Sequence, residues 1–345
     1  MKKTILFLMI ACVFISCNSY KNLTSAELYM ELPDYCPTPD AFAISSEGLI
    51  LSCPNYAEKL AKGVLVLLSK DGKIKELCKV PGIKTGTFAS PMGINYAPDG
   101  TLIVCANQGE NRGQILRMSF KGDKLVKTEV IATGINNPNG VKVHNGNIYV
   151  TTPRLPKFKT TKMTSGIYRF SLNDRNVKVE NDSTDTHLIF TVQTNNPIRQ
   201  FGLDGLDFDK DGNLFVGDFG DGVIYKLKLS ANNEVESQEV YATLSDTTGV
   251  DGIVIDKKGN LYVAGFSQNQ IWKINKKREA ILIAEYPDND GSKGELDQPA
   301  DLIIYDKKLI ISNFDLMTDA DMVNRKHSSP FTLSFIKLRR VKKNK

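Results

Sequence analysis

Short runs of alternating apolar and polar residues recur along most of the chain, and polar turns separate them. The stretch DGLDFDKDGNLFVGD at 204–218 contains a β-prone run, a turn closed by Gly-Asn and a second β-prone run. DGIVIDKKGNLYVAG at 251–265 repeats this order almost position for position. Alternation with a period of two predicts strands, and polar turns that contain glycine predict hairpins between them.

The same pattern occurs six times along the chain. Its copies open at Asp40, Met92, Asn139, Asp204, Asp251 and Asp301. A further alternating segment follows each copy, so we expect about four strands per unit, over roughly 45 to 65 residues. Units of this size are typical of the blades of a β-propeller. We therefore predict an all-β fold, a six-bladed β-propeller with four strands per blade.

The last unit ends with FTLSFIKL at 331–338 and lacks an outermost strand. The run AELYMEL at 26–32 precedes the first unit, and its pairing with the last unit would close the ring and remove two exposed strand edges. We expect residues 26–338 to form a single domain, because no linker-like composition interrupts the repeats. The segments 152–166 and 173–187, between the third and fourth units, predict long loops over one face.

One acidic turn has the spacing of an EF-hand calcium loop. In DFDKDGNLFVGD, Asp207, Asp209 and Asp211 precede Gly212, and Asp218 stands at the twelfth position. The flanking runs show no helical period, and the equivalent turn of the next unit has lysines in place of ligands. We therefore interpret the segment as a solvated hairpin turn.

Both ends of the chain extend beyond the predicted propeller. Residues 1–16 contain two lysines, a short apolar run and a small residue before Cys17, and they resemble a bacterial lipoprotein signal in which Cys17 is lipidated. A plain cleaved signal peptide is the alternative. We expect an exported protein, facing the periplasm or the cell surface, that a lipid alone attaches to the membrane. Residues 17–25 would be the tether, and residues 339–345 form a basic tail.

Charge and cysteine content narrow the functional classes. A net charge of +5 is small for 345 residues, and no basic stripe interleaves with aromatic residues, so we expect no nucleic-acid partner. No later apolar stretch reaches membrane-spanning length. Cys36, Cys53, Cys78 and Cys105 lack the Cys-x-x-Cys spacing of a metal site. We expect structural roles for them, with or without disulfide bonds.

The residues that open the six repeats are candidates for chemistry, because the first strand of each propeller blade lines the central channel. Four of the six are aspartates and a fifth is an asparagine. Unpaired carboxylates are costly to bury, whereas a hard cation such as Ca²⁺ binds carboxylate and amide oxygens. The alternative is that these aspartates only cap neighbouring backbone amides.

Four carboxylates carry more charge than one calcium ion compensates. We therefore expect two or three of them as ligands, with one protonated, some standing back from the metal, or a base approaching them. Arg154, Arg199 and Lys157 are the candidate bases. Asp301 and Met92 are further channel residues in this interpretation.

Three segments carry a family resemblance. NNPNGVKV (136–143), GLDGLDFDKDGNLFVGDFGDGVIYKL (202–227) and GVDGIVIDKKGNLYVAGFSQNQIWKI (249–274) resemble blades of the gluconolactonase, senescence-marker-protein and paraoxonase-like group of six-bladed calcium propellers. The resemblance extends over essentially the whole chain after the signal. It implies one catalytic divalent metal at the end of the channel, with lactones or related esters as substrates.

The resemblance also implies roles for individual residues. It places metal ligands at Asp40, Asn139, Asp204 and Asp251, with Asp251 as the catalytic aspartate. In a register shifted by one blade, Asn139 and Asp204 form the central pair and Asp204 takes the catalytic role. A bound Ca²⁺ would polarise the lactone carbonyl, while the catalytic aspartate would orient or deprotonate the attacking water.

Two features depart from the family pattern. Asp40 stands where the family has a glutamate, and none of His144, His187 and His327 matches the histidine pair of the paraoxonase branch. No Ser/His/Asp or Cys/His constellation is visible.

Two functions therefore remain open. One is a metal-dependent hydrolase of a small sugar lactone or related ester. The other is a non-catalytic propeller that binds a small molecule or a protein, with a structural metal or none. The acidic ring favours the hydrolase, whereas Met92 and the shorter acid at Asp40 favour the binding protein.

Overall fold

The computed structural model describes residues 23–57, 62–316 and 321–338. The predicted lipoprotein signal at 1–16, Cys17 and the basic tail at 339–345 lie outside the described residues. Within the described ranges, no helix is long and apolar enough to cross a membrane.

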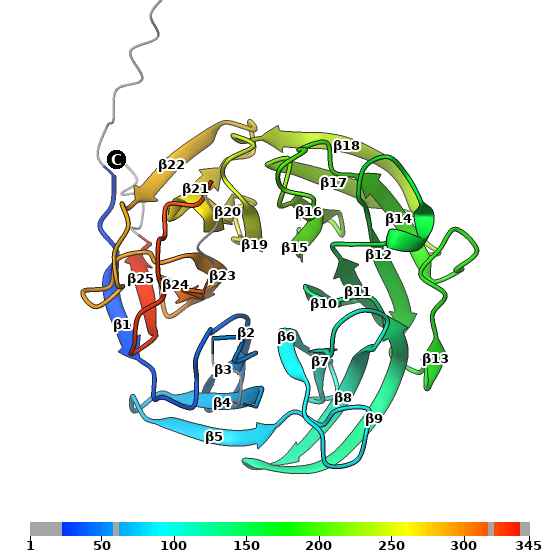
Figure 1. Cartoon of the computed structure of the whole chain (residues 1–345), viewed down its shortest axis with the longest axis horizontal. Helices are drawn as coiled ribbons and strands as arrows, with labels where there is room; N and C mark the ends of the chain where they lie inside the picture. Colours follow the sequence, from blue (N-terminus) through cyan, green and yellow to red (C-terminus); the bar gives the residue numbers. More distant parts are fainter. Residues whose placement is uncertain (1–22, 58–61, 317–320, 339–345) are drawn as a thin grey trace, which may run out of the picture.

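Six β-sheets surround a common axis and form a ring, which confirms the predicted six-bladed β-propeller (Figure 1). The innermost strands are β2 (Phe42–Ile44), β6 (Ser90–Tyr96), β10 (Val141–His144), β15 (Leu203–Phe208), β19 (Val250–Ile255) and β23 (Pro299–Tyr305). Each starts within two residues of the opening of a predicted repeat, so the repeats and the blades coincide.

Three further strands complete each blade from the inside outward. The second strands are β3 (Gly48–Cys53), β7 (Leu102–Asn107), β11 (Asn147–Thr152), β16 (Leu214–Asp218), β20 (Leu261–Gly265) and β24 (Lys308–Asn313). The third strands are β4 (Val64–Ser69), β8 (Gly113–Lys121), β12 (Thr164–Ser171), β17 (Val223–Leu229), β21 (Gln270–Ile274) and β25 (Thr332–Lys337). The outermost strands are β5 (Ile74–Lys79), β9 (Lys124–Ile135), β14 (Leu188–Gln193), β18 (Val235–Thr243), β22 (Ala280–Glu285) and β1 (Glu27–Glu31).

The start of the chain closes the ring, as predicted. β1 pairs antiparallel with β25, with Glu27 opposite Phe335 and Glu31 opposite Thr332. In Figure 1 the blue strand β1 lies beside the red strand β25. This pairing covers the edge that β25 would otherwise expose.

The second blade departs from the predicted four strands. A short fifth strand, β13 (Val177–Lys178), pairs in parallel with β9 on the outside of this blade (Figure 1). It belongs to the segment 173–187, which the sequence predicted to be a loop over one face. Asn181 anchors the segment, because its side chain accepts the backbone N–H of Asn136 (3.1 Å) and donates to the carbonyl of Gly134 (2.7 Å).

Apolar side chains packed between adjacent blades form the core. Strands buried on both faces read as continuous apolar runs, and β3 and β4 show this with the sequences GLILSC and VLVLLS. Leu49 and Leu51 of the first blade pack in one cluster with Ile310 and Leu333 of the sixth. The outermost strand β5 is half-exposed, and its sequence IKELCK accordingly mixes apolar and charged residues.

The acidic turn at 207–218 is a hairpin turn, which confirms its interpretation from sequence. It joins β15 to β16, and strands flank it on both sides. The Oδ1 atom of Asp209 accepts the backbone N–H groups of Asp211 and Asn213, both at 2.9 Å. The carboxylate of Asp209 therefore organises the turn itself.

The four cysteines within the described residues are all free thiols, so no disulfide bond links them there.

Candidate functional site

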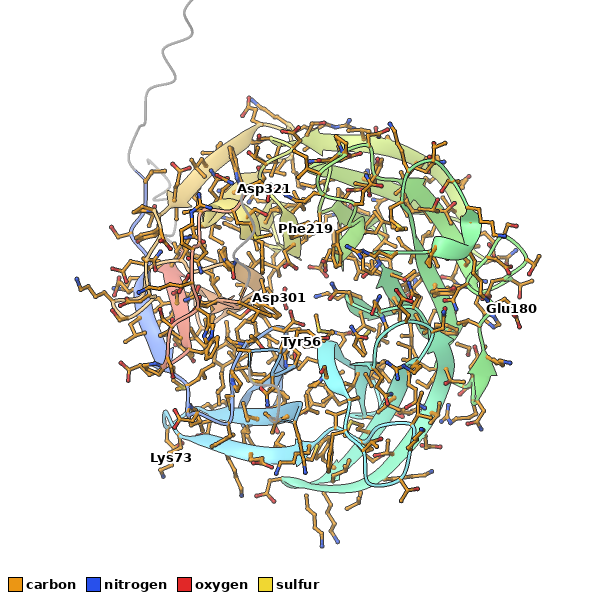
Figure 2. All side chains as sticks on the ribbon, in the orientation of Figure 1. Tyr56, Lys73, Glu180, Phe219, Asp301 and Asp321 are labelled. Carbon is orange, nitrogen blue, oxygen red and sulfur yellow. The ribbon has the colours of Figure 1, made fainter. Side chains whose placement is uncertain are left out.

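A cavity of about 440 Å³ opens at the end of the channel where the six repeats begin. Its deep end is lined by Asp40, Met92, Asn139, Asp204 and Asp251. Below it the channel narrows to a space of about 40 Å³ that four of these residues share with Asp301. Five of the six ring residues thus meet in one cavity, and Asp301 lies beneath them. Figure 2 shows Asp301 near the centre of the ring, with Lys73 and Glu180 at its outer edge.

Bulged strands direct the ring residues toward the axis. The pairing register shifts between Leu203 and Leu206 in β15 and between Val250 and Ile253 in β19, and each shift encloses an Asp-Gly pair. β6 shifts between Pro91 and Ile94, around Met92 and its glycine, whereas the shift in β23 encloses Ala300 and Asp301, so Asp301 takes the place that glycine has in the other three strands. A β-bulge reorients the side chain that it contains. The bulges therefore explain why these positions face the channel.

The glycines after Asp204 and Asp251 permit close contact between blades. A Cβ atom on Gly205 would lie 2.3 Å from the carbonyl oxygen of Asp251, and one on Gly252 would lie 2.5 Å from Oδ1 of Asp301. No side chain fits at these separations. The repeated Asp-Gly pair thus combines a channel-facing acid with a position where only glycine fits.

Hydroxyl groups of the second strands fix the backbone of ring residues in the following blade. Thr151 Oγ1 donates to the carbonyl of Asp204 (2.7 Å). Ser312 Oγ donates to the carbonyl of Asp40 (2.5 Å), across the closure of the ring. Ring residues are therefore held by the neighbouring blade as well as by their own.

The ring carboxyl groups lie close together in a buried space. Only 7% of Asp40 and 3% of Asp204 are exposed. Burial, followed by the charge of Asp301, raises the pKa of Asp204 to about 8, although a hydrogen bond with Asp251 opposes the rise. Burial and the neighbouring carboxylates, Asp204 first among them, raise the pKa of Asp251 well above its usual range. Burial, followed by the charges of Asp301 and Asp204, raises the pKa of Asp40 well above its usual range.

This donor set fits a hard divalent cation. Burial and mutual repulsion favour the protonated form of these carboxyl groups, and a cation bound among them would displace the protons. Asp40, Asp204, Asp251 and the amide of Asn139 offer oxygen donors alone, which is the ligand type that Ca²⁺ prefers. Among the described residues, no three His, Cys, Asp or Glu side chains are placed so that they alone could hold a metal ion. The ring would thus need the asparagine amide, backbone carbonyls or water to complete a coordination shell.

Asp301 is a ring aspartate that hydrogen-bonds a backbone amide, which was the alternative to metal binding considered from the sequence. Its Oδ2 atom accepts the backbone N–H of Phe42 in the first blade at 3.3 Å. Among the described residues, no backbone amide is hydrogen-bonded to the side chain of Asp40, Asp204 or Asp251. These three carboxyl groups therefore remain directed toward the cavity.

A base beside the acidic ring that we did not predict from the sequence is Lys142. Its Nζ atom lies 3.6 Å from Oδ1 of Asp207. Burial raises the pKa of Asp301, and the charge of Lys142 opposes that rise. Lys142 lies on β10 and lines the narrow part of the channel beneath the cavity. The sequence did carry a signal for Lys142, because it lies three residues after Asn139 on the strand that lines the channel.

Two of the three predicted bases form polar contacts with groups outside the acidic ring. The Nε and Nη2 atoms of Arg199 both bond Oδ2 of Asp321 at 2.7 Å. Lys157 donates to the carbonyl of Glu180 (2.5 Å) on the outer surface. Arg154 does line the cavity, with its guanidinium 5.5 Å from the ring centroid of Phe201. Lys157 therefore lies away from the acidic ring, whereas Arg199 lines the same cavity as Arg154, with its guanidinium paired to Asp321.

Five aromatic rings follow one another along the wall of the cavity, and we call them the aromatic crescent. In order they are Phe201, Phe219, Phe266, Phe314 and Tyr56. Successive ring centroids are 5.4, 5.7, 5.8 and 6.2 Å apart. Figure 2 shows Phe219 and Tyr56 beside the central opening. This wall offers a substrate a continuous apolar surface.

The sequence carries a signal for the crescent, although we did not predict this surface from it. Phe219, Phe266 and Phe314 each follow directly after the second strand of their blades. They end the equivalent segments VGDF, VAGF and ISNF. An aromatic residue at one repeat position in three consecutive blades indicates a shared surface on the ring.

Several polar residues of the wall already have partners within the protein. The Oε1 atom of Gln200 accepts the N–H of Met163 (2.7 Å), and its Nε2 donates to the carbonyls of Thr194 and Asn196. The Oδ1 atom of Asn107 accepts the N–H of Gly109 (2.9 Å). The amide of Gln200 therefore has little capacity left for a bound molecule, whereas Asn107 retains the donors of its Nδ2.

The fold and the cavity define a six-bladed propeller with a polar site at the end of its channel. A family model described as the SMP-30/gluconolactonase/LRE-like region matches residues 60–291. The chain belongs to this family. A comparison with curated protein sequences gives no significant match.

Solved structures with the same fold are distant in sequence. A luciferin-regenerating enzyme has 16% identity and a TM-score of 0.60, and the match covers 91% of this chain and 95% of that one. A gluconolactonase from Xanthomonas campestris has 14% identity and a TM-score of 0.57, with 91% and 96% covered. Regucalcin from Agrobacterium tumefaciens, described as a calcium-binding protein, has 13% identity and a TM-score of 0.58, with 92% and 96% covered.

Proposed function

We propose that this protein is a metal-dependent hydrolase of a lactone or related ester. The observation that carries the proposal is the meeting of Asp40, Asn139, Asp204 and Asp251 at the deep end of one cavity. Membership of the SMP-30/gluconolactonase/LRE-like family supports the reaction class, and the calcium-binding description of the Agrobacterium structure supports Ca²⁺ as the metal.

The residues at the deep end of the cavity have separable tasks. Asp40, Asn139, Asp204 and Asp251 would hold the cation, and the bound cation would polarise the carbonyl group of the substrate. Asp251 accepts a proton from water while the water oxygen adds to the carbonyl carbon. Asp251 then returns the proton to the alkoxide oxygen as the acyl C–O bond breaks, which yields a hydroxy acid from a lactone. Asp204, hydrogen-bonded to Asp251, orients it, and in the shifted register the two aspartates exchange roles.

The aromatic crescent favours a substrate with an apolar group. A sugar lactone exposes several hydroxyl groups, each of which needs a polar partner when it is buried. The described wall presents the aromatic crescent together with Met92, Leu316 and Met322, and its polar residues are fewer and partly bonded within the protein. We therefore propose a lactone or ester with an alkyl or aryl substituent, in place of the small sugar lactone expected from the sequence.

Hydrolysis of a lactone panel by the full-length protein, followed through proton release, tests the function. The panel pairs polyhydroxylated lactones with alkyl-substituted and phenyl-substituted ones, each measured with calcium and again after chelation. We expect calcium-dependent turnover, with higher kcat/KM for the substituted lactones. Asp251→Asn should lower kcat by about 100-fold or more, because it removes the proton acceptor.

The matched control is Asp209→Asn, in the exposed hairpin turn away from the cavity, which should retain full activity. Equal loss in the two variants would contradict the role of Asp251. Absence of turnover on every lactone, with calcium shown to be bound, would favour the binding propeller instead.

We also propose that the protein is exported and anchored through a lipid on Cys17, facing the periplasm or cell surface. The support is the sequence of residues 1–16 with the small residue before Cys17. Labelled fatty acid should enter the wild-type protein in a bacterial host, and Cys17→Ser should abolish its incorporation. Equal labelling of the two proteins would contradict the anchor.

A further inference from the structure

Two carboxyl groups are buried in the sixth blade, outside the set that lines the cavity. Asp297, just before β23, is 1% exposed, and Asp315, two residues after β24, is 3% exposed. Neither forms an ion pair with any described lysine or arginine. Burial raises the pKa of Asp315, the charge of the nearby His327 opposes that rise, and the ring of His327 stacks on Phe331. Buried carboxylates require compensation by a cation, a proton or several hydrogen bonds.

Unpaired oxygen atoms lie beside these carboxyl groups. Within the described part of the chain, Oδ1 of Asp297 and Oδ1 of Asn324 are both buried and have no hydrogen-bond partner. Asn324 is 1% exposed, and its Nδ2 donates to Oδ1 of Asp315 (3.0 Å). Burial raises the pKa of Asp297 and a hydrogen bond with Asn324 opposes that rise, which places the amide group between the two carboxyl groups. Buried polar atoms in native proteins nearly always have a partner. A bound cation would supply a partner for such oxygens.

We propose that Asp297, Asp315 and Asn324 form a second divalent-cation site, separate from the channel. All of its side-chain donors are oxygens, and two are carboxylates, a combination that favours Ca²⁺ over softer metals. Asp288 and Asp290, in the segment DNDG before Asp297, add negative charge nearby. A proton on Asp297 is the competing explanation.

The position of this cluster assigns the ion a structural role in shaping the cavity. Asp315 stands between Phe314, a member of the aromatic crescent, and Leu316, a further wall residue. Gln298, which follows Asp297, accepts the backbone N–H of Leu316 through Oε1 (2.7 Å). An ion held by Asp297 and Asp315 would therefore join the β22–β23 connection to the segment after β24 and fix one end of the crescent.

Counting bound calcium tests the second site. The full-length protein is stripped with chelator and dialysed to equilibrium against radiolabelled Ca²⁺, and bound ions per chain are measured. We expect two ions for the wild type, one for Asp297→Asn, one for Asp251→Asn and none for the double variant. Asp34→Asn removes an exposed carboxylate and should leave two ions bound.

Thermal unfolding supplies an independent readout. Calcium should raise the Tm of Asp251→Asn, which retains the second site, by more than it raises the Tm of Asp297→Asn. Without calcium, Asp297→Asn and the wild type should melt at similar temperatures near neutral pH, because burial raises the pKa of Asp297 to about 8 and its carboxyl group then holds a proton. If Asp297→Asn does not fold, Asn324→Ser takes its place in both measurements.

The outcomes separate this site from the channel site. Loss of an ion in Asp297→Asn but not in Asp251→Asn would support the second site even if the proposed function fails. Equal calcium binding by Asp297→Asn and the wild type would overturn the site and favour a proton on Asp297. A single wild-type ion that only Asp251→Asn removes would overturn it as well.

Discussion

Asp204 and Asp251 reach the cavity because the residue that follows each of them has no side chain. The bulge in each strand turns the aspartate toward the axis, and the glycine lets the next blade approach it. At Gly205 the nearest atom of the next blade is the carbonyl oxygen of Asp251 itself. The spacing between two ring carboxylates is thus set by a glycine that contacts no ligand.

Substitution of this glycine tests the relationship. Gly205→Ala places a methyl group 2.3 Å from the carbonyl oxygen of Asp251, so the two blades must separate. We expect a loss of about 1–3 kcal/mol in the free energy of unfolding, as for other overpacked sites, and weaker calcium binding in the channel. Urea denaturation and calcium titration measure the two effects.

The control for this prediction is Gly100→Ala. Gly100 has φ +81°, and no heavy atom lies within 4 Å of the position that an alanine methyl group would take, so alanine there costs backbone strain alone. This variant should retain the calcium affinity of the wild type. If Gly205→Ala retains it as well, the ring spacing does not depend on this contact.

At the scale of elements, the hairpins could be predicted because their signals are local. A period of two in apolar residues and turns such as DKDGN and DKKGN specify strand, turn and strand without reference to the rest of the chain. Asp209 illustrates this, since its carboxylate bonds the amides of its own turn. The six starts of the blades followed from the same signals.

Elements that depend on distant partners could not be predicted in this way. The two-residue strand β13 exists because Asn181 bonds the backbone of the second blade, 45 residues away at Asn136. Arg199 was predicted to approach the acids, but its partner Asp321 comes from the sixth blade. Such pairings are decided by tertiary contact, and a single sequence shows no period or spacing for them.

At the scale of the whole molecule, closure of the ring connects stability to the site. Asp40 belongs to the first blade and Asp301 to the last, and their neighbourhood exists only in the closed ring. Ser312 Oγ bonds the carbonyl of Asp40, and the carboxylate of Asp301 accepts the N–H of Phe42. Strand β1 secures this junction, because Tyr29 and Met30 pack against the core shared by the first and sixth blades.

Removal of β1 should therefore affect both folding and the cavity. A variant that lacks residues 1–31 loses the pairing of β1 with β25 and the partial burial of Tyr29 and Met30. We expect about 2–4 kcal/mol less free energy of unfolding, from the lost apolar burial, and self-association through the exposed edge of β25.

A variant that lacks residues 1–25 retains β1 and is the matched control. Urea denaturation and light scattering compare the two proteins, and calcium affinity in the channel should fall only in the shorter one, because Asp40 then loses its fixed position. Equal stability and equal affinity in both variants would show that the blades hold the ring closed without β1.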